Sequence, residues 1–120
     1  MKDMTCEVSR WKQLKNQLNN LEPAEFARVV EEQRGIIIDV RTPEEYAAGH
    51  LSGAINLDYF SYEFWDEIEK LDPEAPYYIY CRSARRSIRA CTLMRNGGFT
   101  QVYNLEGGLV SWQESVGALV

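Results

Sequence analysis

Short continuous apolar runs alternate along this chain with segments in which apolar residues recur every three or four positions. The continuous runs are typical of strands buried on both faces of a parallel sheet, and they occupy residues 36–40, 54–57, 77–80 and 101–103. The spacing of three to four indicates helices, which we expect over 22–35, 42–49, 60–71 and 84–96 and after 108. Strands that alternate with helices predict an α/β domain with a mostly parallel sheet.

The starts of two predicted helices carry helix-capping residues. Thr42 is followed by Pro43 and, three positions after the threonine, by Glu45. This order predicts a capping box, in which the threonine and glutamate side chains each accept from the other's backbone N–H group. Proline favours the first helical position, and Pro23 opens the preceding helix in the same way. We expect Gly49 to end the helix that Thr42 begins.

The first twenty residues differ from the rest because they are polar, with Trp11, Leu14 and Leu18 at helical spacing. This pattern fits a short helix that docks on the domain, and it fits a loose arm equally well. We therefore divide the chain into an N-terminal polar extension, 1–20, and one domain, 21–120. A domain of this length is expected to bury a single core.

Composition argues against several classes of function. The net charge of −5 argues against a nucleic-acid partner. The chain has no apolar stretch of about 18 residues and its start forms no apolar signal segment, so we expect no membrane partner and a cytoplasmic location. The cysteines, Cys6, Cys81 and Cys91, form no Cys-x-x-Cys pair, which argues against a disulfide framework and a zinc site. We expect no metal and no nucleotide cofactor.

The segment that follows the apolar run 77–80 carries the clearest chemistry. Cys81 stands at the predicted strand end, and a helix is predicted to begin a few residues later. Backbone N–H groups at such a helix start, with about half a positive charge from the helix dipole, favour a thiolate over a thiol. The same segment contains four arginines: Arg82, Arg85, Arg86 and Arg89. We interpret Cys81 as a nucleophile and the arginines as a site for small anionic substrates.

Three groups of residues resemble the signatures of rhodanese-like domains. They are DVRTPEEY at 39–46 with GHLSGAIN at 49–56, YCRSARRS at 80–87, and GFTQVYNLEGGLVSW at 98–112. The second of these is similar to the active-site loop of the family. Together the three extend over about residues 20–115 in the order and spacing of the family. The resemblance implies a three-layer α/β domain with a mostly parallel five-stranded sheet flanked by helices.

The resemblance also implies sulfurtransferase chemistry. A Cys81 thiolate would attack the outer sulfur of thiosulfate or a persulfide donor, and the Cys81 persulfide would pass this sulfur to a thiol or cyanide. The loop's backbone N–H groups would hold the terminal sulfur, and its arginines would attract the anionic donor. The implied binding residues are Arg82, Ser83, Ala84, Arg85, Arg86 and Ser87. Of the two serine hydroxyls, we favour Ser87 as a donor to the sulfur, because it falls in the first turn of the helix.

The chain departs from many members of the family at Ala84, where they carry glycine. Glycine permits a positive φ and a close approach of the backbone. Alanine at this position therefore either constrains the loop or gives it an ordinary negative φ. Either outcome would affect the rate of the reaction and the choice of donor.

Three alternative functions remain open at this point. A cysteine-dependent phosphatase or arsenate reductase needs Cys-x5-Arg, but that arginine position is Ser87, and Arg86 gives only Cys-x4-Arg. The shorter loop suits a sulfur atom better than a phosphate group, which an arginine grips with two hydrogen bonds. The second alternative is a regulatory interaction module without catalysis. The third is a persulfide carrier that delivers sulfur to one sulfur-accepting protein.

Several other side chains have a structural interpretation. Asp39 and Arg41 follow a predicted strand end, where they could support the site as a second layer, and we expect them to form a structural salt bridge or cap. His50 is expected to bond to nearby backbone or to Glu45 and not to act as a general base. Cys91 is expected to be a small buried apolar residue. The aromatic residues assigned to core packing are Phe60, Trp65 and Trp112.

Overall fold

The computed structural model describes residues 10–120. Its strands are β1 (Asn19–Leu21), β2 (Ile36–Asp39), β3 (Ile55–Asn56), β4 (Pro76–Tyr80) and β5 (Gln101–Leu105), and its helices are α1 (Arg10–Asn16), α2 (Pro23–Gln33), α3 (Pro43–Ala47), α4 (Phe64–Glu69), α5 (Arg85–Asn96) and α6 (Gly108–Ser115). The strands form one sheet in the order β1-β5-β4-β2-β3, and every pair in it is parallel. The expected α/β fold with a parallel five-stranded sheet is confirmed. None of the helices in this stretch is long and apolar enough to cross a membrane.

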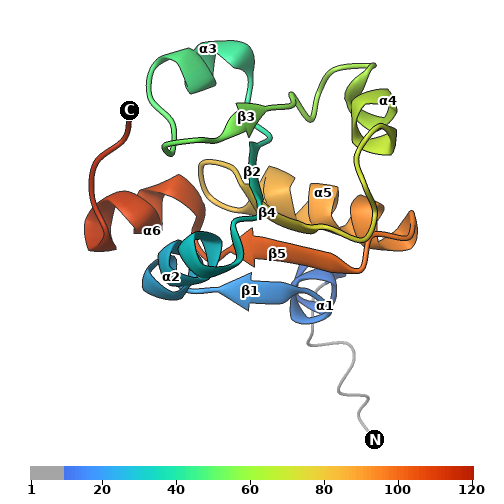
Figure 1. The fold of residues 1–120 in the computed structure, drawn as a ribbon, viewed down its shortest axis with the longest axis horizontal. Coiled ribbons are helices and arrows are strands. Elements are labelled where there is room, and N and C mark those ends of the chain that lie inside the picture. Colours follow the sequence, from blue (N-terminus) through green and yellow to red (C-terminus); the bar gives the residue numbers. More distant parts are fainter. Residues whose placement is uncertain (1–9) are drawn as a thin grey trace, which may run out of the picture.

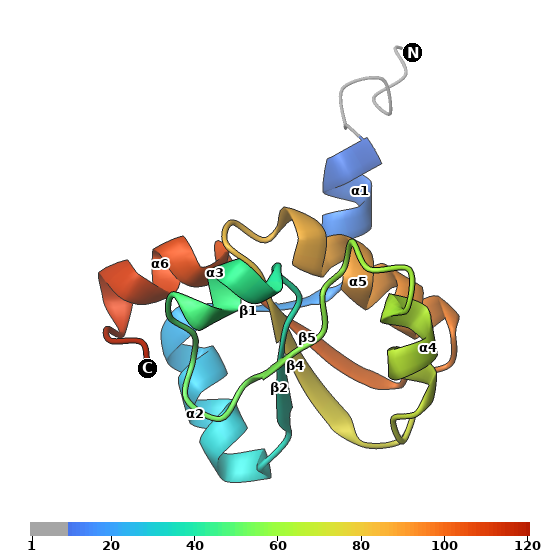
Figure 2. The ribbon, with the colours of Figure 1, turned by 90° about the horizontal axis from the view of Figure 1, so that it is seen from above.

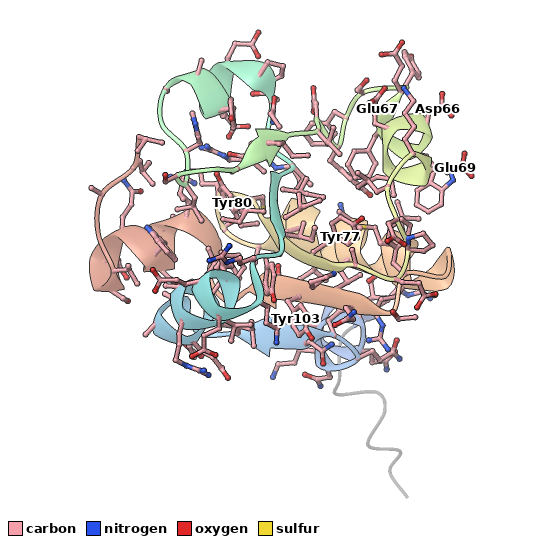
Figure 3. All side chains as sticks on the ribbon, viewed as in Figure 1. Asp66, Glu67, Glu69, Tyr77, Tyr80 and Tyr103 are labelled. Atoms are coloured by element: carbon pink, nitrogen blue, oxygen red, sulfur yellow. The ribbon has the colours of Figure 1, made fainter. Side chains whose placement is uncertain are left out.

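Helices cover both faces of the sheet, which gives the domain three layers (Figure 1). Figure 2 shows α2 and α6 on one side of the strands and α4 and α5 on the other. Alternate side chains of β4 point to opposite faces of the sheet. Tyr77 and Ile79 pack toward α4 and α5, whereas Tyr78 and Tyr80 pack toward α2 and α6. Figure 3 shows Tyr77 and Tyr80 on β4, with Tyr103 on the neighbouring β5. Burial on both faces explains why the central strands are continuously apolar.

The edge strand β1 was not among the strands that the apolar pattern predicts. Its three residues pair with β5 through backbone hydrogen bonds, with Leu21 opposite Leu105, and the expected boundary at residue 20 falls inside it. The preceding helix α1 packs against α5, and the Lys15 ammonium lies 2.6 Å from the Glu106 carboxylate. Residues 10–21 are thus packed on the domain, while Cys6 lies outside the described residues.

The capping box predicted at the start of α3 is confirmed. Thr42 Oγ1 accepts from the Glu45 backbone N–H at 3.3 Å, and Glu45 Oε1 accepts from the Thr42 backbone N–H at 3.0 Å. The helix ends at Ala47, two positions before Gly49. The bonds from Thr42 to Glu45 Oε1 hold the Glu45 carboxylate in a fixed position at the start of α3.

The segment 60–71 forms a shorter helix than its spacing predicts. α4 begins at Phe64, because Phe60 to Glu63 form a turn in which Asp58 and Ser61 side chains accept backbone N–H bonds. Phe64 and Ile68 enter the core, but Phe60 is 67% exposed. The assignment of Phe60 to the core is therefore wrong.

Candidate active site

Cys81 lies where the carboxyl ends of the two central strands meet. Asp39 at the end of β2 is in register with Tyr80 at the end of β4, and Cys81 is the next residue. In Figure 1 the chain loops from this point into α5. Ligand sites of parallel α/β sheets lie at this edge. Cys81 is only 1% exposed, so the surrounding chain encloses its sulfur.

Two hydrogen bonds join the Cys81 sulfur to Ser87 in the first turn of α5. The backbone N–H of Ser87 donates to Sγ at 3.4 Å, and the thiol donates to Ser87 Oγ at 3.6 Å. Sequence reasoning expected the hydroxyl to donate to the sulfur. In the structure the hydroxyl accepts from it, because its own proton has two other acceptors, Asn104 Oδ1 at 2.6 Å and the Ala84 carbonyl oxygen at 3.1 Å. The backbone contact is the kind that stabilises a thiolate at a helix start.

Ala84 occupies a left-handed conformation at the N-cap of α5, with φ 80° and ψ −4°. Of the two possibilities open from the sequence, the ordinary negative φ is wrong, and alanine constrains the loop. A left-handed residue other than glycine costs about 1–2 kcal/mol, because its Cβ crowds the following carbonyl. The fold holds this strained turn, which lets the chain reverse between Cys81 and α5.

We expect Ala84→Gly to raise the free energy of unfolding by about 0.5–1 kcal/mol. Removal of Cβ relieves the left-handed strain, and the greater freedom of glycine in the unfolded chain offsets part of the gain. Urea denaturation measures the change. The matched control is Ala27→Gly, in the interior of α2, which is expected to be destabilising. A loss of stability in Ala84→Gly would show that the turn is not strained.

The start of α6 fixes the loop from the other side. The backbone N–H groups of Leu109 and Val110 donate to the carbonyl oxygens of Cys81 at 2.9 Å and of Arg82 at 3.1 Å. Gly108 permits this approach, since a Cβ there would lie 2.5 Å from the Arg82 oxygen. Gly108 also has a φ of 66°, which strains any other residue. Gly107 and Gly108, which the sequence indicates as the start of a helix, thus also bring that helix onto the loop that follows β4.

Arg86 is held by Glu45 at the rim of the loop. Its guanidinium donates to both carboxylate oxygens, at 2.7 and 3.1 Å, and lies 5.6 Å from the centre of the Phe60 ring. The hydrogen bonds from Arg86, assisted by those from Thr42, lower the pKa of Glu45 to about 2. One carboxylate therefore caps α3 and also fastens α3 to α5.

The Glu45–Arg86 pair predicts a pH dependence of stability. Because the pKa of Glu45 is lower in the folded than in the unfolded chain, the contribution is complete above about pH 4.5 and is lost as the pH falls toward about 2. The Glu45 side chain is 32% exposed, so we expect solvent screening to limit the contribution to about 1–2 kcal/mol.

Glu45→Gln tests this dependence because glutamine keeps the capping oxygen but not the charge. Unfolding in urea at a series of pH values should show a difference in stability from the parent that is largest near pH 6 and narrows as the pH falls from about 4.5 toward about 2. The matched control is Glu32→Gln, which breaks the exposed pair with Arg28 and should change little. A gap that stays constant with pH would contradict the account.

Asp39 and Arg41 form the expected buried salt bridge. The Arg41 guanidinium donates to Asp39 at 3.0 Å from Nε and 2.7 Å from Nη2, and it also donates to the Gly49 carbonyl at 2.6 Å. The Tyr80 hydroxyl donates to the same carboxylate at 2.7 Å. Burial, together with this hydrogen bond to Asp39, raises the pKa of Tyr80, so its hydroxyl remains a donor. The cluster joins the ends of β2 and β4 beneath the site.

The remaining loop residues face outward. Arg82, Ser83 and Arg85 are exposed, so the structure brings Arg86, Ser87 and Ala84 close to Cys81 and leaves the other three at the surface. A positively charged rim around a buried sulfur is suited to small anions. No group of three or more His, Cys, Asp or Glu side chains that could hold a metal ion occurs between residues 10 and 120.

The structural roles expected for His50 and Cys91 are confirmed. His50 Nδ1 lies 2.9 Å from the Tyr46 carbonyl oxygen, and its ring stacks on the Tyr46 ring with 3.8 Å between centroids. Cys91 is fully buried, and burial raises the pKa of its thiol. Trp65 and Trp112 pack against the two core clusters, as expected.

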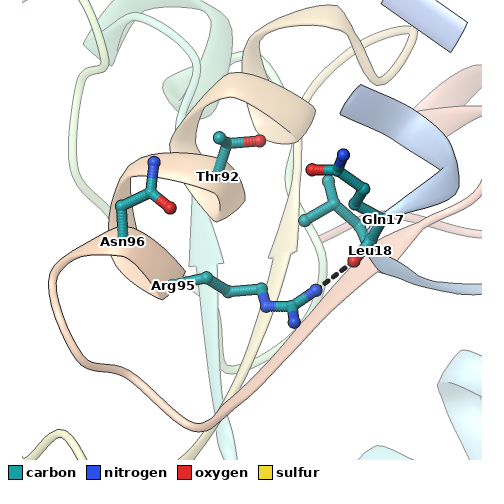
Figure 4. A pocket seen from close by; sticks show the side chains of 5 residues that line it. All are labelled: Gln17, Leu18, Thr92, Arg95 and Asn96. Carbon is teal, nitrogen blue, oxygen red and sulfur yellow. Dashed lines mark hydrogen bonds between the residues drawn. The ribbon is translucent and has the colours of Figure 1, made fainter. Parts of the chain in front are cut away.

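Hollows of the described surface lie away from Cys81. One, with a volume of about 410 Å³, lies between the end of α1 and α5 (Figure 4), and its lining residues are Gln17, Leu18, Thr92, Arg95 and Asn96. Arg95 crosses it to donate to the Gln17 carbonyl. The candidate site is instead marked by the buried Cys81 sulfur and its contact with the start of α5.

Sequence reasoning did not assign a role at the site to Glu45 as a partner of Arg86 or to Asn104. Nothing local in the sequence joins Glu45 to Arg86. Asn104 did carry a signal, because it is a polar residue inside the apolar run Val102 to Leu105, and a buried amide requires a hydrogen-bond partner.

Known proteins are similar to this chain over most of its length. The model of the rhodanese-like domain matches residues 22–115. A thiosulfate sulfurtransferase GlpE from Pseudomonas fluorescens is 34% identical over 93 residues, which cover 78% of this chain and 84% of the relative. A tRNA uridine(34) hydroxylase from Chlamydia abortus is 33% identical over 118 residues, which cover 93% of this chain but 35% of that protein.

Solved structures show the same similarity. The polysulfide-sulfur transferase from Wolinella succinogenes superposes with a TM-score of 0.79 at 26% identity, covering 99% of this chain and 90% of that one. A rhodanese-like domain from the Alr3790 protein of Anabaena gives a TM-score of 0.75, also at 26% identity, covering 84% and 77% of the two chains. With a buried loop cysteine, a matching domain model and relatives above 30% identity, this chain belongs to the rhodanese-like domain family.

Proposed function

We propose that this chain is a sulfurtransferase that moves a sulfane sulfur from thiosulfate or a persulfide donor to a thiol or cyanide. The observation that carries the proposal is the position of the Cys81 sulfur at the carboxyl end of β4, 3.4 Å from a backbone N–H of α5. Sulfur transfer is also the activity that the names of the P. fluorescens and W. succinogenes relatives state. The free thiols of Cys81 and Cys91 suit a reducing compartment such as the cytoplasm.

The proposed reaction needs no external oxidant or reductant. The Cys81 thiolate attacks the outer sulfur of thiosulfate, a bond forms between the two sulfurs, and sulfite leaves with the electron pair of the broken bond. Cyanide or a thiolate then attacks the outer sulfur of the persulfide, and the Cys81 thiolate leaves. Backbone N–H groups of the loop stabilise negative charge on the sulfur in both steps.

The structure gives a phosphatase less support. The position at which a phosphatase would need its arginine is Ser87, whose hydroxyl is buried and bonded to Asn104. The adjacent Arg86 has both of its terminal nitrogens on Glu45, so it does not offer the two-pronged grip that a phosphate group needs.

The test is a pair of turnover assays on the same preparation. We expect formation of thiocyanate from thiosulfate and cyanide, and we expect no release of p-nitrophenol from p-nitrophenyl phosphate. Hydrolysis of the aryl phosphate without thiocyanate formation would overturn the proposal and favour the phosphatase.

Arg86→Ala should weaken the use of thiosulfate more than Arg89→Ala does. Loss of Arg86 removes one positive charge and leaves the Glu45 carboxylate unpaired beside the loop, where it repels an anion. We expect KM for thiosulfate to rise about tenfold for Arg86→Ala and to change less than about twofold for Arg89→Ala, which is exposed. Steady-state kinetics at fixed ionic strength measure both. Equal effects would mean that the arginines act only as a diffuse field.

A protein acceptor is a second candidate, favoured by the exposure of two aromatic residues beside the arginine rim. Phe60 is 67% exposed and Tyr62 is fully exposed, and the Phe60 ring lies against the guanidinium of Arg86. Aromatic residues and arginines are enriched at protein interfaces. With reduced thioredoxin as a protein acceptor and glutathione as a small one, Tyr62→Ser should slow only the transfer to thioredoxin, and Leu93→Ser, an exposed control on α5, should slow neither. Equal slowing of both acceptors would exclude a docking role for Tyr62.

A further inference from the structure

A row of hydrogen bonds, buried at Ser87 and Asn104 and half-buried at Asn20, leads from the Cys81 sulfur to the end of α1. The Ser87 hydroxyl donates to Asn104 Oδ1 at 2.6 Å, Asn104 Nδ2 donates to Asn20 Oδ1 at 2.9 Å, and Asn20 Nδ2 donates to the Lys15 carbonyl at 2.8 Å. Ser87 and Asn104 are completely buried. The row thus connects the catalytic loop with β5, with the edge strand β1 and with α1.

The far end of the row fixes its direction. Asn20 Nδ2 lies 2.8 Å from the Lys15 carbonyl oxygen and 3.3 Å from the Leu18 carbonyl oxygen. Carbonyl oxygens only accept, so the amide nitrogen of Asn20 must face them and its oxygen must face Asn104. Asn104 must then turn its nitrogen to Asn20 and its oxygen to Ser87. This oxygen is the nearer acceptor of the single hydroxyl proton of Ser87, at 2.6 Å, and the Ala84 carbonyl oxygen is a second acceptor at 3.1 Å.

The segment 15–18, which carries these carbonyl groups, is itself held in place. The Lys15 side chain pairs with Glu106, the residue that follows β5, and Arg95 of α5 donates to the carbonyl of Gln17 (Figure 4). These contacts attach the end of α1 to β5 and α5. The orientation of Asn20 is therefore set by the packing of α1 and not by the active site.

We propose that Asn104 is a positioning residue that keeps the hydroxyl proton of Ser87 away from the Cys81 sulfur. The sulfur then faces a lone pair of the hydroxyl, and its anion receives the backbone N–H of Ser87 but not the O–H. A thiolate without an O–H donor is harder to form and, once formed, is a stronger nucleophile, because thiolate nucleophilicity falls as the thiol becomes more acidic. This inference rests on the proposed sulfur-transfer function.

Other groups act on the same sulfur and stay unchanged in the variants below. Arg86, from the first turn of α5, interacts electrostatically with Cys81, and so does the buried thiol of Cys91, five residues further along that helix. On the side of β5 the group that reaches Ser87 is the neutral amide of Asn104. A change caused by Asn104 can therefore be separated from a change of nearby charge.

The test is the pH profile of alkylation of Cys81 by iodoacetamide, followed at the Cys81 peptide by mass spectrometry. In Asn104→Leu the Ser87 hydroxyl loses its nearer acceptor, and its proton is shared between the Ala84 carbonyl oxygen, at 3.1 Å, and the sulfur. We expect the midpoint of the profile to fall by up to about one pH unit. The plateau rate should fall by up to about threefold, because the nucleophilicity of a thiolate depends on the pKa of its thiol with a coefficient of about 0.4–0.5. In a Ser87→Ala background, Asn104→Leu should leave the midpoint unmoved.

Asn20→Ala tests the same inference from a distance, since it removes the group that orients the Asn104 amide. It should lower the midpoint in the same direction, by less than one unit. The matched control is Asn19→Ala, the neighbouring β1 residue, whose side chain bonds to the Val102 carbonyl and not to the row; its profile should equal that of the parent.

A midpoint that stays in place or rises in both Asn104→Leu and Asn20→Ala would overturn the positioning role. A shift of equal size in the Ser87→Ala background would do the same. These outcomes are distinct from failure of the proposed function, in which the parent protein itself forms no thiocyanate, because the alkylation profile reports on the thiol whether or not sulfur is transferred.

Discussion

Replacing Cys81 with serine should reduce the transfer of sulfur from thiosulfate to cyanide by at least about a thousandfold while leaving the fold intact. A serine hydroxyl is not ionised near neutral pH, and it cannot form the persulfide on which the proposed reaction depends. The fold should survive because the contacts of the Cys81 side chain with Ser87 are ones that a hydroxyl can also make. Steady-state formation of thiocyanate measures the loss, and circular dichroism checks the fold.

Cys91→Ala is the matched control for this experiment. Cys91 is a second buried free thiol on α5, but its contacts are with the core, so its removal should leave thiocyanate formation within about twofold of the parent. If Cys81→Ser kept its turnover while Cys91→Ala lost it, the nucleophile would be assigned to the wrong cysteine.

Asp39→Ala should lower the free energy of unfolding by about 3–5 kcal/mol. The substitution removes the carboxylate but leaves the Arg41 guanidinium buried, where it still donates to the Gly49 carbonyl. It also leaves the Tyr80 hydroxyl without the oxygen to which it donates. An unpaired buried charge and an unpaired buried donor are among the most destabilising consequences of a single substitution.

Urea denaturation at neutral pH measures this loss. Glu67→Ala, which breaks the exposed pair with Lys70, is the control and should change stability by less than about 0.5 kcal/mol. A loss below about 1 kcal/mol in Asp39→Ala would mean that the Asp39–Arg41–Tyr80 cluster does not hold the strand ends together.

Local chemistry accounts for the part of the fold that could be predicted from the sequence. The capping box at Thr42 and Glu45 is complete within four residues, so the start of α3 follows from the sequence alone. The central strands β2 and β4 are buried on both faces, and their apolar runs are continuous for that reason. The prediction that Cys81 is the nucleophile rests on its place between such a run and a helix start.

The features that were missed depend on contacts between distant parts of the chain. β1 is a three-residue edge strand, held by its pairing with β5, so it has no apolar pattern of its own. Phe60 and Phe64 are four positions apart, which is a helical spacing, so the sequence predicts a helix that begins at Phe60. The side chains of Asp58 and Ser61 instead hold a turn there. The pairing of Glu45 with Arg86 joins residues 41 positions apart, and no local pattern indicates it.

The central claim is that Cys81 carries the transferred sulfur, and the mass of the intact protein tests it most directly. After incubation with thiosulfate and removal of the excess, we predict a gain of one sulfur atom, about 32 Da, which is absent from Cys81→Ser and which cyanide removes as thiocyanate. A parent protein whose Cys81 thiol is free beforehand and that gains no sulfur, or a Cys81→Ser variant that gains the same mass, would contradict the account.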